Sequence, residues 1–246
     1  MTDHPLTGKL ALVTGASRGI GAATAVALGE RGAHVIITAR TSGGLEEVEE
    51  RIHKGGGSAT IAPLDLTDGE SIGRLANAVA ERWGTLDILV LNAAMLGTLA
   101  PVSAIDAKEF ARLITLNLTA QQALIAAFDP MLRKSSDGRL VAITSGVAQN
   151  PRAYWGAYAA SKAALETLVT AYGEEVKNIS AVRTAILDPG PTRTAMRAKA
   201  YPGEDPAALK SPRPRGFTGK REYGERERAR RVFRSTRGGG DAGLWR

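Results

Sequence analysis

Short apolar segments alternate with longer helical patterns along most of this chain, and that alternation narrows the folds open to it. Segments rich in β-branched and aliphatic residues lie at 10–13, 35–38, 59–64, 86–91, 139–144 and 182–187. Helical patterns lie between them at 19–31, 44–54, 68–83, 106–132 and 154–176. Strands that are apolar on both faces need helices on both sides, and repeated strand–helix–strand units place such strands parallel. The pattern therefore predicts an α/β fold with one doubly wound parallel sheet and helices on both of its faces.

Composition excludes several classes of protein and of site. Of the 246 residues, 43% are hydrophobic and 23% are charged, which is typical of a globular chain. The chain has no cysteine and three scattered histidines, so we expect no disulfide, no cysteine nucleophile and no metal site. No apolar run reaches the ~18 residues of a membrane span. The first residues lack the layout of a signal peptide, which predicts a cytoplasmic location and no membrane partner.

Positive charge is concentrated at the C-terminal end. Residues 211–246 contain 11 Lys or Arg and 4 Asp or Glu, whereas residues 1–210 contain 21 of each kind. We therefore expect one domain over 1–205 and a basic, Gly/Pro/Arg-rich tail over 206–246 that is poorly ordered and leaves the C-terminal edge of the sheet incomplete. The tail is either a replaced or frame-shifted terminus or a basic extension for nucleic acid or anionic surfaces. Its arginines come without interleaved aromatic residues at stacking spacing, which disfavours nucleic acid as a partner.

A glycine-rich turn, Thr-Gly-x3-Gly-x-Gly at 14–21, joins the first strand to the first helix. Free N–H groups and the positive end of the helix dipole meet at such a junction, which suits a pyrophosphate. The glycines allow the backbone to approach the ligand closely. An ordinary tight turn is the alternative, but the flanking strand and helix favour a dinucleotide site.

The end of the second strand bears on the choice of dinucleotide. An acidic residue there would bind the ribose hydroxyl of NAD, whereas an arginine accommodates the 2′-phosphate of NADP. Arg40 occupies this position, the next acid is Glu46, and Arg18 lies in the glycine-rich turn. The two arginines predict NADP, with NAD the less favoured cofactor, unless both are simply solvated surface residues.

Three residues have the chemistry of an acid/base site. Tyr158 and Lys162 are four residues apart, so they share one face of a helix. A cation within ~4–6 Å lowers a tyrosine pKa by roughly 1–3 units, which makes the phenol a usable acid or base. Ser145 ends the fifth strand, where ligands of doubly wound sheets bind, and could hold a substrate oxygen. A packing tyrosine, a surface lysine and a turn serine are the alternatives.

Asn117 lies on the apolar stripe of the 106–132 pattern. An inward asparagine needs hydrogen-bond partners or lowers stability. It is either a core asparagine satisfied by water or a member of the site.

These motifs together resemble the short-chain dehydrogenase/reductase family. The glycine-rich turn, Asn92-Ala93 after the fourth strand, Ser145 and the Tyr158-x3-Lys162 pair occur in the family's order, and the resemblance covers about residues 7–200. It implies a Rossmann-like nicotinamide-binding sheet and hydride transfer between NADP(H) and a carbonyl or alcohol. The family's Asn-Asn-Ala-Gly is Leu-Asn-Ala-Ala at 91–94 here.

The resemblance also implies roles for individual residues. Tyr158 would transfer the proton, Ser145 would steady the substrate oxygen, Lys162 would lower the tyrosine pKa and bind the ribose, and Asn117 would hold a relay water. The cofactor would be bound by Gly15, Ser17, Arg18, Gly19, Ile20, Gly21, Arg40, Asp65, Leu66, Asn92, Ala93, Tyr158, Lys162, Pro189, Gly190, Thr192 and Thr194.

The substrate and the assembly are less defined. The resemblance implies a small carbonyl or alcohol substrate and a homodimer or homotetramer packed through the 106–132 and 154–176 helices. Tyr154 and Trp155 would form an apolar wall of the pocket or simply pack, and Arg152 is either a contact for an anion or solvated. If the unusual tail abolished the pocket, the chain would be a cofactor-binding pseudoenzyme or a defective reductase.

Overall fold

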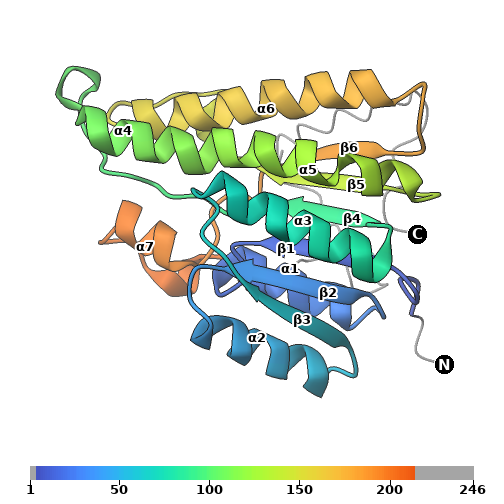
Figure 1. The fold of residues 1–246 in the computed structure, drawn as a ribbon. Helices are drawn as coiled ribbons and strands as arrows, with labels where there is room; N and C mark the ends of the chain where they lie inside the picture. The colour runs from blue at the N-terminus through green and yellow to red at the C-terminus, as the bar shows by residue number, and fades with distance from the viewer. Residues whose placement is uncertain (1–3, 214–246) are drawn as a thin grey trace, which may run out of the picture.

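A parallel sheet of six strands forms the centre of the structure, a computed structural model that describes residues 4–213 (Figure 1). The strand order is β3-β2-β1-β4-β5-β6, so the order reverses beside β1. This is the doubly wound, Rossmann-like sheet that the alternating pattern predicts. The strands are β1 (Leu10–Thr14), β2 (His34–Ala39), β3 (Ser58–Pro63), β4 (Ile88–Leu91), β5 (Arg139–Ile143) and β6 (Arg183–Leu187).

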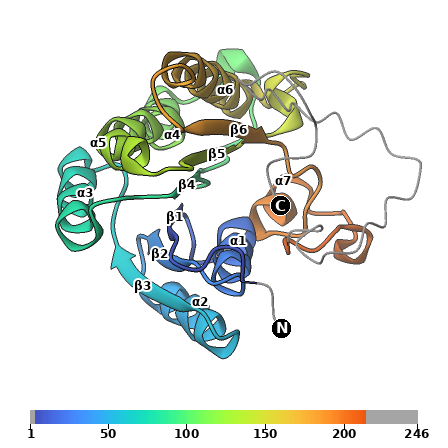
Figure 2. The ribbon, with the colours of Figure 1, turned by 90° about the vertical axis from the view of Figure 1, so that its right-hand side faces the viewer.

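Helices cover both faces of the sheet (Figure 2). One face is covered by α1 (Gly19–Gly29) and α2 (Gly43–Lys54). The other is covered by α3 (Gly69–Trp83), α5 (Ala120–Lys134) and α6 (Gly156–Val176). Two shorter helices, α4 (Ala107–Ile114) and α7 (Ala195–Ala200), lie toward the end of the sheet to which the strands point (Figure 1).

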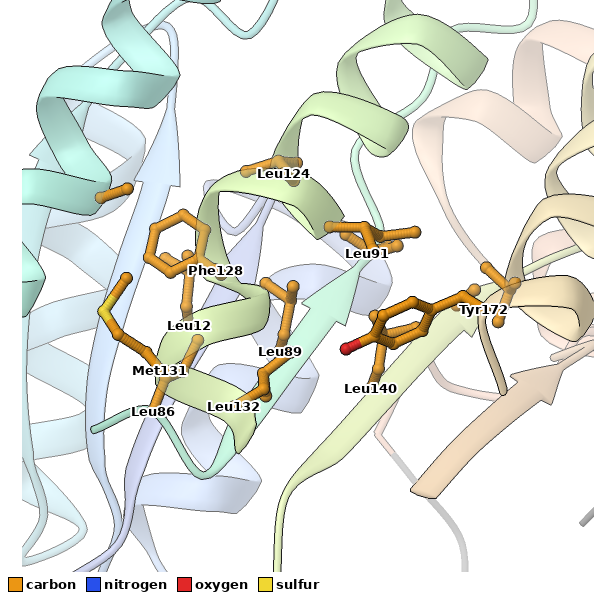
Figure 3. Packing of buried hydrophobic residues seen from close by; sticks show 14 of the residues in the cluster. Leu12, Leu86, Leu89, Leu91, Leu124, Phe128, Met131, Leu132, Leu140 and Tyr172 are labelled. Atoms are coloured by element: carbon orange, nitrogen blue, oxygen red, sulfur yellow. The ribbon is translucent and has the colours of Figure 1, made fainter. Parts of the chain in front are cut away.

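Two apolar cores result, one on each face. Successive side chains of β1 point to opposite faces of the sheet. Every residue of β1 is buried, because helices cover both faces. Leu12 and Leu89 pack with Phe128 of α5 (Figure 3). Val13 packs with Leu28 of α1 on the opposite face. Full burial of such a side chain contributes about 1.5–3 kcal/mol, so the continuous apolar runs of the strands are what hold both helical layers in place.

The long helical region expected over 106–132 is present at 107–134, but it is not α-helical throughout. A π-helical segment, Thr115–Thr119, interrupts it between α4 and α5. The 154–176 helix begins only at Gly156, because Tyr154 has a φ of 72°. The sequence analysis did not predict α7 or the 3-10 turns at Val102–Ala104, Gly146–Ala148 and Pro206–Ala208.

The chain beyond β6 folds back on itself. Lys210 O accepts a hydrogen bond of 2.9 Å from Arg193 N, and Lys210 forms an isolated bridge with Thr192. Residues 206–213 of the expected tail therefore form a turn against the loop that follows β6. Residues 214–246 lie outside the described part, so the domain boundary at 205 and the properties expected of the tail stay predictions. Within residues 4–213, β6 is an edge strand.

Candidate active site

The glycine-rich turn lies against the end of β4. Gly15 and Gly19 have φ values of 63° and 59°, which other residues rarely adopt. A Cβ on Gly15 would lie 2.8 Å from Ala93 Cα, and one on Gly21 would lie 2.3 Å from Gly15 O. Only glycine fits at these two contacts. The turn therefore forms a cradle that is lined by backbone atoms rather than by side chains.

The start of α1 fits an anion. Arg18, the residue before the helix, makes no capping hydrogen bond with its side chain, and the first turn contains no acidic residue. The first N–H groups of a helix have no partner within the helix, and here they face the carboxyl ends of the strands. Ser17 and Ile20 belong to the same turn, and the Arg18 side chain is exposed. The residues present thus fit the pyrophosphate of a dinucleotide.

Thr14 and Asn92 join this turn to β4. The Thr14 hydroxyl donates to Val90 O over 3.1 Å and accepts from Asn92 N and Ala93 N over 3.0 and 3.1 Å. The Asn92 amide donates to Thr14 O over 2.8 Å and to Gly15 O over 3.2 Å. The sequence analysis gave no role to the Thr14 side chain, whose signal was its place at the end of an apolar strand.

Arg40 and Asp65 follow β2 and β3, at the same end of the sheet, and both are exposed. Hydrogen bonds from Thr67 N and Thr67 Oγ1, and then the charge of Arg40, hold the pKa of Asp65 below its usual value. Leu66 beside it is buried. The structure thus brings these predicted cofactor residues to the edge where β1 and β4 also end.

The loop after β6 reaches the glycine-rich turn. A Cβ on Gly19 would lie 3.4 Å from the Thr194 methyl group. The Thr192 hydroxyl donates to Gly190 O over 3.0 Å and to Pro189 O over 3.3 Å, which shapes the loop from within. Of the predicted loop residues, Thr194 therefore lies against the start of α1.

Tyr158 and Lys162 lie on α6, facing the ends of β4 and β5. Lys162 is 2% exposed, and its ammonium donates to Ile143 O over 2.8 Å. The Lys162 Nζ atom lies 5.9 Å from the centre of the Tyr158 ring. Ser145 follows β5 and belongs to a cleft of about 30 Å³, which is lined by Thr144, Ser145, Gly146, Gln149, Asn150, Glu166 and Asp188.

The electrostatics of this pair differ from the expectation. Burial, and then the negative charge of Asp188, raise the pKa of Tyr158 to about 12. Burial lowers the pKa of Lys162 to about 8, although Glu166 opposes the shift. The lowering of the tyrosine pKa expected from Lys162 is not found in this arrangement, because burial and the charge of Asp188 both act to raise it.

Asn117 lies in the π-helical segment and is fully buried. Its Oδ1 accepts from Met95 N over 2.8 Å, and its Nδ2 donates to Met95 O over 2.9 Å and to Ser161 Oγ over 3.1 Å. The Ser161 hydroxyl in turn donates to Tyr158 O over 2.8 Å. Protein atoms, rather than water, thus satisfy the Asn117 amide group, which links the loop after β4 to the helix carrying Tyr158.

Gln121 is a further buried residue of this site, which the sequence analysis did not identify. Its Nε2 donates to Leu116 O over 2.8 Å and to Ala93 O over 3.2 Å, and its Oε1 is buried without a partner. It ties the π-helical segment to the loop that begins at Asn92. The only signal was its position four residues after Asn117, on the same helical face.

An apolar cluster covers Tyr158, which is 7% exposed. Trp155 lies edge-on to the Tyr158 ring at 6.0 Å, and Tyr201 lies 5.7 Å from Trp155. Arg152 donates to the Tyr201 hydroxyl over 3.2 Å. The cluster comprises Leu96, Val147, Tyr158 and Ala159, with Leu99, Trp155, Met196 and Ala200 packed against them.

The described residues offer neither a membrane helix nor a metal cluster. No helix within 4–213 is long and apolar enough to cross a bilayer. In the same range, no three His, Cys, Asp or Glu side chains come together so as to hold a metal ion.

This fold and this arrangement define a dinucleotide-binding oxidoreductase domain. A model of the short chain dehydrogenase family matches residues 9–205. The chain therefore belongs to the short-chain dehydrogenase/reductase family of NAD(P)-dependent oxidoreductases. It is 37% identical over 210 residues to the uncharacterized oxidoreductase YciK of Escherichia coli K12, covering 84% of this chain and 82% of that one.

Solved structures agree. A short chain dehydrogenase from Shigella flexneri 2a, in complex with NADP, has a TM-score of 0.82 and 36% identity, covering 87% of this chain and 89% of that one. One from Escherichia coli CFT073, in complex with NADPH, has a TM-score of 0.81 and 38% identity, covering 86% and 88%. The similarity extends over the whole described fold rather than over the glycine-rich turn alone.

Proposed function

We propose that this protein reduces a carbonyl compound to an alcohol with NADPH. The observation that carries the proposal is the Lys162 ammonium, which is buried beside Tyr158 at the ligand-binding end of the sheet. Burying a cation is costly, so its retention here indicates a function, and it adjoins the cradle for a dinucleotide. The two similar structures that contain NADP or NADPH support the cofactor.

The cofactor would be held at both of its ends. The N–H groups at Gly19, Ile20 and Gly21 would bind the pyrophosphate, and Arg18 and Arg40 would pair with a 2′-phosphate. Asp65 and Leu66 would border the adenine, with Asn92 and Ala93 beside the adjoining ribose. At the other end, Lys162 would donate to the ribose hydroxyls, and the loop with Pro189, Gly190, Thr192 and Thr194 would close over the nicotinamide.

Each catalytic residue then has one task. The nicotinamide supplies a hydride to the carbonyl carbon when it is bound. Tyr158, with a pKa of about 12, keeps its proton at neutral pH and donates it to the carbonyl oxygen, as reduction requires. Ser145 donates a hydrogen bond to the same oxygen. Lys162 stabilises the tyrosinate that remains, and Asn117 holds the loop after β4 against the helix that carries Tyr158.

Tyr158→Phe tests this mechanism. A panel of ketones, aldehydes and acyl thioesters would be assayed with NADPH, and NADPH binding would be measured by fluorescence on the same samples. We expect the variant to lose turnover by about 10²–10⁴-fold, because the proton donor is gone, while NADPH binds as before. Near-normal turnover in the variant would contradict the mechanism. NADPH binding without turnover of any substrate by the wild type would indicate a pseudoenzyme.

We also propose that two copies associate through α5 and α6. On α6, Ala163 and Ala164 are half-buried within a single chain, and their small side chains allow a second helix to approach closely. Sedimentation velocity of the wild type and of Ala164→Arg tests this proposal. A stable monomer of the wild type at micromolar concentration would contradict it.

A further inference from the structure

Tyr154 adopts a backbone conformation that its residue type disfavours. Its φ of 72° is the one positive value found for a non-glycine residue within 4–213. Residues with a side chain are strained at such a φ, apart from asparagine and aspartate, whereas glycine adopts it readily. The conformation is imposed by the turn before α6, in which Trp155 N donates to Arg152 O over 3.1 Å and Tyr154 O accepts from Ala100 N over 3.1 Å.

The strained turn sends two neighbouring aromatic side chains into different surroundings. Trp155 packs edge-on against the catalytic Tyr158. Tyr154, by contrast, is 60% exposed, so burial of its ring in the core does not offset the backbone strain. Glycine would fit the backbone better and would remove an exposed aromatic group. Strained positions of this kind concentrate at functional sites.

Val102 provides a second exposed apolar surface beside this turn. It is 75% exposed, and its Cγ2 lies 2.8 Å from where a Cβ on Gly156 would be, two residues after Tyr154. The loop with Val102 follows β4 and the loop with Tyr154 follows β5, and the Ala100–Tyr154 hydrogen bond joins them. Ligands of doubly wound sheets bind outside these strand ends, so both residues belong to loops that flank the proposed site.

We propose that Tyr154, with Val102, contacts the apolar arm of the substrate outside the reacting centre. The proposal deepens the carbonyl reductase function proposed above and rests on it. The substrate class is a carbonyl compound with an extended aliphatic or aromatic arm. Its carbonyl group lies at Tyr158 and Ser145, and its arm leaves the site over Tyr154 and Val102. Tyr154 is thus a specificity-determining residue, and contact with the arm compensates for the strain of its backbone.

The test is a series of straight-chain aldehydes of about four to ten carbons, assayed with NADPH. Each methylene that becomes buried raises kcat/KM by about fourfold, so we expect the wild type to favour the longer members. Tyr154→Gly keeps the turn and removes the ring. It should reduce kcat/KM about tenfold for the longest aldehydes and less than twofold for the shortest, and Val102→Ser should act in the same direction.

A stability measurement separates this role from a structural one. Tyr154→Gly should melt no lower than the wild type, because glycine accepts the positive φ without strain. Ile179→Ser is the matched control, since Ile179 is 67% exposed but follows the far end of α6, and it should change neither stability nor the length dependence. An equal loss on all aldehydes, or an unchanged length dependence in Tyr154→Gly, would overturn this inference alone. A wild type that reduces no carbonyl compound would overturn the proposed function and this inference together.

Discussion

At the scale of single residues, Lys162 lowers the stability of the protein, because its ammonium group is buried in the candidate site. Its pKa of about 8 lies below the ordinary 10.5, so between these values the unfolded chain binds more protons than the folded one. The penalty that Lys162 imposes on the free energy of unfolding is therefore fully present below about pH 8. It disappears as the pH rises toward 10.5.

Lys162→Met should therefore abolish turnover yet stabilise the protein at pH 7 by roughly 1–3 kcal/mol. The stabilisation comes from removing the buried charge, and loss of the hydrogen bond to Ile143 O reduces it to this range. Urea denaturation at pH 7 and pH 10 measures this gain, which should shrink at the higher pH. Lys54→Met, at an exposed site on α2, should show no such difference. A variant less stable than the wild type at pH 7 would contradict the desolvation argument.

Arg40 decides the choice of cofactor on our proposal. Arg40→Asp removes a charge-assisted contact to the 2′-phosphate, worth about 1.5–3 kcal/mol. NADPH affinity should therefore fall by roughly 10–100-fold, and the preference should turn to NADH. Titrations of both dinucleotides measure this, with Arg51→Asp on α2 as a control of equal charge change. Tighter binding of NADH than of NADPH by the wild type would refute the assignment.

At the scale of elements, the β1–α1 turn depends on the absence of a side chain at Gly21. Gly21→Ala would place a Cβ 2.3 Å from Gly15 O and 2.5 Å from Asn92 Nδ2. The turn and the end of β4 would have to separate, so we expect a loss of about 2 kcal/mol or more and weaker NADPH binding.

Gly73→Ala on α3 is the control for this prediction. Apart from its chain neighbours and the nearby backbone of α3, no heavy atom lies within 4 Å of the Cβ it would add, so it should raise stability by about 0.5–1 kcal/mol. Denaturant unfolding and NADPH titration of both variants measure the two effects. An unchanged NADPH affinity in Gly21→Ala would show that this contact does not shape the cofactor site.

At the scale of the whole molecule, Asp87 joins the sheet at the end opposite the site. It accepts from Lys9 Nζ over 3.0 Å, from Leu10 N over 2.9 Å and from Ser135 Oγ over 2.6 Å. Burial acts to raise the pKa of Asp87, but the three hydrogen bonds outweigh it and hold the pKa below the usual value. Asp87 therefore contributes stability above about pH 4, and this is lost as the pH falls through its folded-state pKa.

Asp87→Asn should cost about 2–4 kcal/mol at pH 7, because an amide cannot replace the charge and presents its own donors to these groups. The difference from the wild type should shrink below pH 4. Urea unfolding at neutral and acidic pH measures it, with Glu81→Gln on the exposed face of α3 as the control. A pH-independent difference would show that the charge of Asp87 is not what stabilises the sheet.

Much of the fold followed from local pattern alone. All six strands lie where the apolar segments predict them. In β1 and β4 every residue is buried, which excludes most polar residues, whereas the edge strands β3 and β6 are only partly buried. The pairing of Tyr158 with Lys162 followed from helical geometry, and the cradle at Gly15, Gly19 and Gly21 from the junction of strand and helix. These features depend on neighbours in the chain, so spacing was sufficient to find them.

Contacts between distant segments decided the rest. Asn117, in the π-helical segment, bonds to Met95, 22 residues away, and no period in the 106–132 pattern records that contact. The raised pKa of Tyr158 and the lowered pKa of Lys162 come from burial beneath other elements. The positive φ of Tyr154 likewise comes from a turn joined to the loop after β4. The sequence by itself determined the sheet, its helices and the residues that we propose as the reacting groups. Only the tertiary structure decided the burial of these residues, the hydrogen bonds that support them and the conformation of the loops around them. Desolvation and long-range hydrogen bonds arise only when remote segments pack together.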